Sequence, residues 1–212
     1  MLKGIDLSHH QRAGRVNFRR LKSMGYDFVI LRAGYGKYLC QKDKAFDSHY
    51  CCAKAAGLHV GAYHYSYATT VEEALREADC FLTWIKGKEI DYPVALDIED
   101  SCQKKLTTKQ RTDIALAFMT KVEEAGYYTM LYSSANWLSK RLDMSRLKHF
   151  DVWLACYSDE KKRDKLYRGS FGIWQHTSSR LLPSVYGGRL DENYAYKSYA
   201  RIIRNAGLNN LQ

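Results

Sequence analysis

Apolar and polar positions along the 212-residue chain follow one order three times. A stretch with helical spacing is followed by a glycine and then by a run of β-forming residues, in segments 18–31, 46–65 and 114–132. A glycine directly after a helix adopts the left-handed conformation that other residues resist, so each glycine marks a helix end. The pattern therefore predicts helices that alternate with strands.

Capping residues mark helix starts in the same segments. Thr70 stands three positions before Glu73, as in a capping box, and Thr107 or Thr108 precedes a long amphipathic stretch. We expect helices near 18–24, 46–56, 71–85, 114–125 and 135–142, with a last helix within 192–206. We expect strands near 2–7, 27–32, 58–65, 93–98 and 127–132, then 152–157, 171–175 and 189–191 without a strong helix between them.

This alternation places the chain in the α/β class, with a parallel sheet and helical crossovers. The order is five strand–helix units followed by three strands. Periodicity alone leaves open whether the sheet closes into a barrel. Because no Pro-, Gly- or Ser-rich linker interrupts the chain, we expect one domain over 1–212.

Composition narrows the class of protein. Hydrophobic residues make up 46% of the chain and charged residues 26%, which excludes a disordered chain. No apolar run approaches the roughly 20 residues that cross a bilayer, so we expect no membrane insertion. No apolar signal-peptide segment opens the chain. The six cysteines form no CxxC pair, and we expect free thiols that act as small core residues.

Charge and aromatic content suggest partners without choosing among them. The net charge of +10 suits a nucleic acid, an anionic membrane surface or a cell-wall polyanion. The 17 tyrosines suit sugars or bases, although a tyrosine-rich core is the ordinary alternative.

Polar and aromatic residues gather where the predicted strands end. The ends of parallel strands form the ligand face of such folds, so we expect a cleft there. The residues at these ends include Asp6, Arg32, Tyr63, Tyr65, Asp97, Glu99, Tyr132, Trp174, Gln175 and Asp191.

Asp97 and Glu99 are the sharpest feature, because they follow a strongly apolar strand. A period of two puts both on one side, with Cα atoms about 6.5 to 7 Å apart. Two carboxyl groups this close do not both ionise easily, so one is expected to stay protonated near neutral pH. A protonated acid beside an ionised one can cleave a glycosidic bond. Asp6 adds a third carboxylate to the same face.

Other chemistries find less support. Asp6, His9, His10 and His64 could bind a metal, but His9 and His10 are adjacent and point apart on an extended chain. Ser8 and Ser66 lack the Gly-x-Ser-x-Gly turn of a serine nucleophile. We expect no metal and no cofactor.

The ordered set of motifs resembles glycoside hydrolase family 25, the N-acetylmuramidase lysozymes of bacteria, their phages and some fungi. The matching segments are 4–8 with Gln11, 28–33, 61–65, 95–99, 131–133, 151–155 with Tyr157, 174–178 and 191–193. Cys156 and His176 depart from the residues expected at their positions.

The resemblance implies a flattened TIM-like barrel of five βα units and three strands. It implies cleavage of the β-1,4 bond between N-acetylmuramic acid and N-acetylglucosamine, with Glu99 as general acid and Asp97 as its partner. Asp6 and Asp191 would complete an acidic floor. The residues expected to contact sugars are Tyr63, Tyr65, Tyr132, Trp174 and Gln175. Arg32 would position an acid or form a plain structural ion pair.

Several points stay open from the sequence. The reaction retains or inverts the configuration of the anomeric carbon, or it proceeds through the substrate's 2-acetamido group. We favour the acetamido route by resemblance. A chitinase-like or glucosaminidase activity is one alternative, and a non-catalytic polyanion-binding domain is another. We expect a monomer that acts on bacterial peptidoglycan outside the cell or at the wall. We expect neither a nucleic-acid partner nor a separate wall-binding module.

Overall fold

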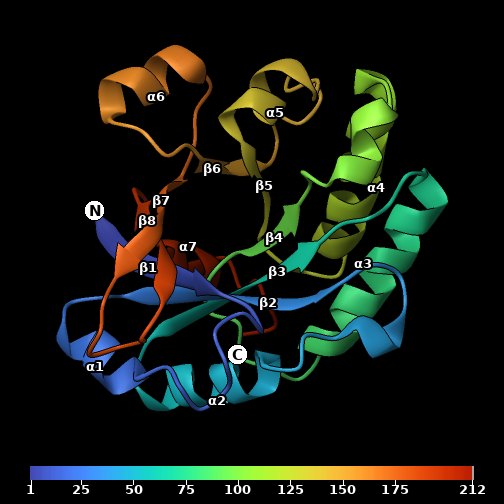
Figure 1. Ribbon diagram of the computed structural model, residues 1–212. Coiled ribbons are helices and arrows are strands. Elements are labelled where there is room, and N and C mark those ends of the chain that lie inside the picture. Colours follow the sequence, from blue (N-terminus) through green and yellow to red (C-terminus); the bar gives the residue numbers. More distant parts are fainter. Residues whose placement is uncertain (212) are drawn as a thin grey trace.

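Eight strands close into a barrel in the computed structural model, which describes residues 1–211 (Figure 1). The strands are Leu2–Leu7 (β1), Phe28–Tyr35 (β2), His59–Tyr65 (β3), Val94–Asp97 (β4), Thr129–Ser134 (β5), Asp151–Ala155 (β6), Ile173–Leu181 (β7) and Arg189–Ala195 (β8). The helices are Phe18–Ser23 (α1), Phe46–Ala55 (α2), Val71–Ile85 (α3), Thr108–Glu124 (α4), Ala135–Lys140 (α5), Glu160–Leu166 (α6) and Tyr199–Asn205 (α7), with short 3-10 turns at Leu39–Gln41 (η1) and Ser101–Lys105 (η2).

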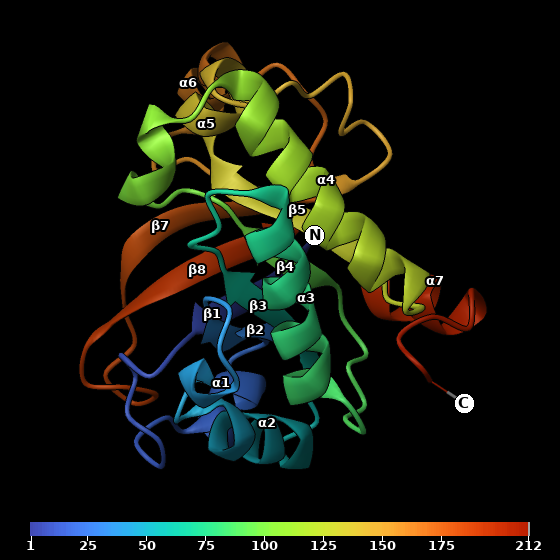
Figure 2. The same ribbon diagram turned by 90° about the vertical axis from the view of Figure 1, so that its right-hand side faces the viewer.

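One strand of the barrel runs against all the others. Strands β1 to β7 pair in parallel with their neighbours in turn, and β8 runs antiparallel to both β7 and β1. Helices α3 and α4 lie side by side on the outer surface, α3 over β2 and β3 and α4 over β4 and β5 (Figure 2). The predicted α/β barrel with a TIM-like arrangement is confirmed.

The helix ends follow the glycine pattern read from the sequence. Gly25, Gly57 and Gly126 all have φ between 73° and 88°, the left-handed region. Thr107 accepts a hydrogen bond from the Gln110 amide in a full capping box, whereas Thr70 caps the Glu73 amide alone. These local signals correctly placed α1, α2, α3 and α4.

Three elements differ from the prediction. Helix α6 connects β6 to β7, and it was missed because its sequence, EKKRDKL, shows almost no apolar periodicity. Strand β7 continues to Leu181 rather than ending at residue 175. The last helix is only α7, because 192–195 continue β8, where Ala195 pairs with both Leu2 and Ile173. Pairing on both sides at the barrel seam overrides the helical pattern of this segment.

Alternation along the strands divides the apolar residues into two cores. Ala95 joins the barrel interior with Phe28 and Trp153. Leu96 joins the layer between the strands and the helices. Gly61 on β3 is required for close packing, because a Cβ there would stand 2.5 Å from the backbone oxygen of Pro93, just before β4. The odd-numbered residues of β4 therefore face the barrel interior, Asp97 among them.

The cysteines only partly match the expectation. Cys80 and Cys156 are buried, as expected of small core residues, but Cys40, Cys51, Cys52 and Cys102 are exposed, and all six are free thiols. Burial was inferred from their place in helical patterns, yet these four stand on outer helix faces or in turns. Among the described residues, no helix is long and apolar enough to span a membrane.

Candidate active site

Carboxylates from three strands meet at one end of the barrel. Asp6 near the end of β1 stands opposite Asp191 at the start of β8. Across the barrel, Asp97 ends β4, where it pairs with Tyr65 on one side and Tyr132 on the other. The antiparallel direction of β8 explains why its first residues, and not its last, lie at this end.

Asp97 and Glu99 form the acid pair predicted from the sequence. The Asp97 side chain is buried, and its Oδ1 has no hydrogen-bond partner among the described residues. Burial raises the pKa of Asp97 well above its usual value, and the charges of Glu99 and Asp6 raise it further. Burial also raises the pKa of Glu99, as do the nearby Asp100 and Asp191 carboxylates. The site therefore retains protons that isolated carboxyl groups would lose.

Asp6 is held by two side-chain amides. Gln175 Nε2 and Asn193 Nδ2 each donate to Asp6 Oδ2 at 2.8 Å. Burial and the Asp191 carboxylate raise the pKa of Asp6, while the two amide hydrogen bonds lower it. Asp6 and Asp191 are thus neighbouring acids, of which Asp6 is fixed in place by the two amides.

The orientation of both amides is set by a further layer of donors. Trp153 Nε1 donates to Asn193 Oδ1 at 2.7 Å, and an indole N–H can only donate. The hydroxyls of Tyr132 and Tyr157 donate to Gln175 Oε1 at 2.9 and 2.8 Å. Each amide oxygen is therefore occupied, which leaves its NH₂ group to face Asp6.

Three of the predicted sugar contacts line this end of the barrel. Tyr63 and Tyr132 pack edge-on against Trp153, with ring centroids 6.0 and 4.5 Å away. The Tyr65 hydroxyl donates to Asp100 Oδ2 at 3.0 Å. Burial and neighbouring carboxylates raise the pKa of all three phenols, so they stay protonated and able to donate.

Trp174 makes a different contact from the one expected of it, and Arg32 follows one of its two expected roles. Trp174 is buried in the layer outside the strands, where Nε1 donates to the Cys156 oxygen and the Arg163 guanidinium stacks 4.4 Å from its ring. Neighbouring residues on a strand face opposite ways, so Trp174 points away as Gln175 points toward Asp6. Arg32 Nε pairs with Asp43 at 2.8 Å, the structural ion-pair alternative.

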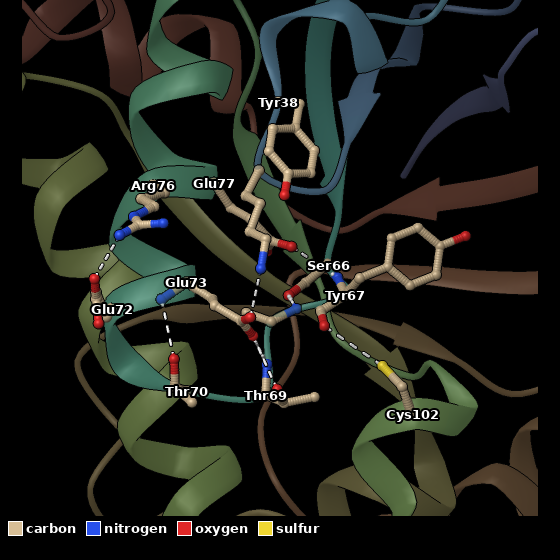
Figure 3. A network of polar contacts seen from close by, with 12 residues as sticks. Tyr38, Ser66, Tyr67, Thr69, Thr70, Glu72, Glu73, Arg76, Glu77 and Cys102 are labelled. Carbon is tan, nitrogen blue, oxygen red and sulfur yellow. Dashed lines mark hydrogen bonds and ion pairs between the residues drawn. The ribbon is translucent and has the colours of Figure 1, made fainter.

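The loop after β3 is anchored by hydrogen bonds to α3 and to the end of β4 (Figure 3). Ser66 N donates to the Asp97 carbonyl at 2.9 Å. Glu77 accepts from the Tyr67 amide at 2.9 Å, and Glu73 accepts from the Thr69 amide at 2.8 Å (Figure 3). These bonds from α3 keep the end of β3 in register with Asp97.

Two residues outside the predicted site take part in this network, Trp153 and Asn193, together with Tyr157, which was expected at a strand end beside the sugars. A period of two from Asp191 would have placed Asn193 on the same side of β8 as that acid. No comparable local signal identifies Trp153. Among residues 1–211, no group of three or more His, Cys, Asp or Glu side chains could hold a metal ion.

The family model and the related sequences that match this chain point to the same family. The family model described as glycosyl hydrolases family 25 matches residues 5–185. The chain is 29% identical to the autolytic lysozyme of Clostridium acetobutylicum over 90% of this chain, and it spans 55% of that protein. It is 30% identical to lysozyme M1 of Streptomyces globisporus over 95% of this chain, and it spans 70% of that protein. The chain thus covers only part of the length of these relatives.

Solved structures share the barrel. The CTP1L endolysin superposes with a TM-score of 0.81 at 27% identity, covering 97% of this chain and 70% of that protein. A muramidase from Trichobolus zukalii superposes with a TM-score of 0.77 at 25% identity, covering 97% of this chain and 99% of that one.

Proposed function

This chain belongs to glycosyl hydrolases family 25, and we propose that it hydrolyses peptidoglycan at the β-1,4 bond between N-acetylmuramic acid and N-acetylglucosamine. The observation that carries the proposal is the acid pair at the end of β4, where burial raises the pKa of both Asp97 and Glu99. The lysozyme and muramidase names of the relatives agree with this substrate.

Glu99 is the general acid in this proposal. Its side chain is less buried than that of Asp97, and its raised pKa keeps a proton available at the mouth of the barrel. A carboxylic acid protonated near working pH can give that proton to the leaving oxygen as the glycosidic bond breaks.

Asp97 assists through the substrate's 2-acetamido group. The acetamido oxygen attacks the anomeric carbon while the bond to the leaving oxygen breaks and that oxygen takes the proton of Glu99. Water then attacks the same carbon, gives a proton to Glu99 and restores the acetamido group. Asp97 Oδ1 has no partner among the described residues and can accept the acetamido N–H during both steps.

The remaining site residues position sugar and acid. Tyr63, Tyr65 and Tyr132 offer protonated hydroxyls and ring faces to the sugars. Gln175 acts through Asp6, which with Asp191 forms the acidic wall opposite Glu99. Residues 1–212 act as one catalytic domain and as a monomer on the wall outside the membrane.

Replacing the acid tests the proposal directly. Glu99→Gln should lower the rate of wall clearing by about 10² to 10⁴-fold, because the amide cannot give up a proton. The matched control is Glu124→Gln, at the far end of α4, which should clear walls like the parent chain. Wild-type lysis by folded Glu99→Gln protein would refute the role of Glu99.

Product analysis separates the bond specificities. A muramidase leaves N-acetylmuramic acid at the new reducing end, whereas a glucosaminidase leaves N-acetylglucosamine there. Borohydride reduction of digested walls, followed by mass spectrometry of the muropeptides, identifies the reduced sugar. Reduced N-acetylglucosamine would replace the proposed specificity with the glucosaminidase or chitinase-like alternative.

A further inference from the structure

Two segments far apart in the sequence carry basic residues and no acidic ones. Between Asp6 and Asp27 there is no Asp or Glu, and between Asp164 and Asp191 there is none either. The first segment carries five Lys and Arg residues, namely Arg12, Arg15, Arg19, Arg20 and Lys22. Other stretches, such as residues 193–212, also lack acids, but the first segment carries more basic residues than they do.

The fold brings these two segments together. Asn17 N donates to the Val185 carbonyl at 2.9 Å, and Arg20 Nε donates to Ser184 Oγ at 3.4 Å. The Tyr186 hydroxyl donates to the His10 carbonyl at 3.1 Å. The connection between β7 and β8 therefore reaches α1 (Figure 1). We call the surface formed by residues 9–22 and 182–189 the basic face.

The six Lys and Arg side chains of the basic face, the five named above and Arg189, are exposed and uncompensated. Within residues 1–211, none of them makes an ion pair with a carboxylate. Elsewhere the surface pairs Lys42 with Asp47 and Lys109 with Asp113. Six unneutralised charges on one face create a positive potential that paired charges do not.

The basic face also contains a cavity, and it starts beside the proposed active site. A cavity of about 420 Å³ opens between α1 and α2 and is lined by Arg15, Arg19 and Asn17 among others. The face begins at the loop that leaves β1 directly after Asp6 and Leu7. A polymer that lay along it would therefore run beside the proposed active site.

We propose that the basic face binds the phosphodiester polymer of a cell wall, of the poly(glycerol phosphate) type, and so holds the domain on walls that carry it. The inference rests on the proposed function for the wall as partner. Repeated phosphates match a row of separate guanidinium and ammonium groups, and the cavity has room for one polymer unit. A single-stranded nucleic acid fits less well, because binding it relies on aromatic stacking. Among the described residues 9–24, the only exposed large hydrophobic side chain is that of Met24, which is not aromatic.

The test separates a local site from the net charge of +10. The variant Arg15→Gln/Arg19→Gln/Lys22→Gln removes three charges from the basic face. The matched control Lys161→Gln/Lys162→Gln/Lys165→Gln removes three exposed charges from α6, which lies at the opposite end of the molecule (Figures 1 and 2). Both carry Glu99→Gln, so that walls stay intact during sedimentation binding assays.

We expect the basic-face variant to bind walls that carry poly(glycerol phosphate) at least about tenfold more weakly, and the α6 control to bind within about twofold of the parent. The slope of log affinity against log salt should fall by about two to three for the basic-face variant, since each lost phosphate contact removes about 0.7 to 0.9. Soluble poly(glycerol phosphate) should compete for parent binding.

Three results would overturn the proposal. Equal losses in both triple variants would assign binding to net charge. Unchanged binding of the parent to walls stripped of the polymer by hydrofluoric acid would remove the ligand. Stronger competition by DNA than by poly(glycerol phosphate) would make the face a nucleic-acid site. Sugar release from stripped walls by chains that retain Glu99 tests the proposed function separately, because it needs no polymer.

Discussion

Asp97 combines a buried position and an oxygen unpartnered within residues 1–211 with a proposed catalytic role. Its side chain is buried, and Oδ1 has no partner among the described residues. An ionised carboxylate in such a place lowers stability, because burial removes hydration that no hydrogen bond replaces at that atom. The residue therefore trades stability for a reactive acceptor, as functional sites commonly do.

The stability of Asp97→Asn tests this trade. The pKa of Asp97 is raised on folding, so the unfolded chain loses this proton at a lower pH than the folded chain does. The stability that the protonated acid provides is complete below the unfolded pKa, near 3.9, and is lost as pH rises toward the folded value. Asp97→Asn should then be more stable than the parent by about 1–3 kcal/mol at pH 7 and similar to it near pH 4, by urea unfolding.

Asp100→Asn provides the control of opposite sign. Although burial raises the pKa of Asp100, hydrogen bonds from Cys102 and Tyr65 outweigh it and lower that pKa. Removing this carboxylate should destabilise the protein at pH 7, and the difference should shrink as pH falls. A neutral-pH stability of Asp97→Asn below that of the parent would contradict the cost assigned to the Asp97 charge.

Single residues were predictable where strand periodicity alone decides their direction. Asp97 ends the apolar strand β4 and Glu99 follows it by two positions, and the charge of Glu99 acts on Asp97 as that spacing predicts. Arg32 was ambiguous because its partner, Asp43, comes from a loop whose path the sequence does not reveal. Trp153 joins the site through Asn193, 40 positions away, a contact that only barrel closure creates.

At the scale of elements, the contact between β3 and β4 depends on one glycine. Gly61→Ala would place a Cβ 2.5 Å from the Pro93 oxygen, and backbone cannot yield as a side-chain tip can. We expect a loss of about 1–3 kcal/mol in the free energy of unfolding and slower wall clearing, because Asp97 would shift with β4. Denaturant unfolding and turbidity assays measure both.

Gly187→Ala is the comparison for that variant. A Cβ at Gly187 meets nothing within 4 Å, so this change should stay within about 0.5 kcal/mol of the parent. Equal stability of the two variants would mean that β3 and β4 tolerate separation.

The sequence predicted helices and strands correctly where apolar periodicity is strong, as in α3. It missed α6, which has almost no apolar periodicity, and the end of β8, where pairing with β1 and β7 decides the structure.

At the scale of the whole molecule, β8 ties the two ends of the chain together. Ala195 pairs with Leu2 at the start of β1 and with Ile173 at the start of β7, so no strand of the described barrel is an edge. Opening the barrel at this seam exposes both the interior around Trp153 and the outer layer around Trp84. The two cores therefore depend on the same closure.

We expect the chain to unfold in one transition because of that closure. Tryptophan fluorescence reports on Trp84 in α3, Trp137 in α5, Trp153 in β6 and Trp174 in β7, while far-UV circular dichroism reports on all helices. In urea, both signals should give the same midpoint and slope, which is the test of two-state behaviour. Ala195→Asp buries a charge at the seam and should lower the free energy of unfolding by several kcal/mol. Both urea midpoints should therefore fall together. Separate midpoints, or loss of one signal before the other in Ala195→Asp, would show that part of the barrel holds without β8.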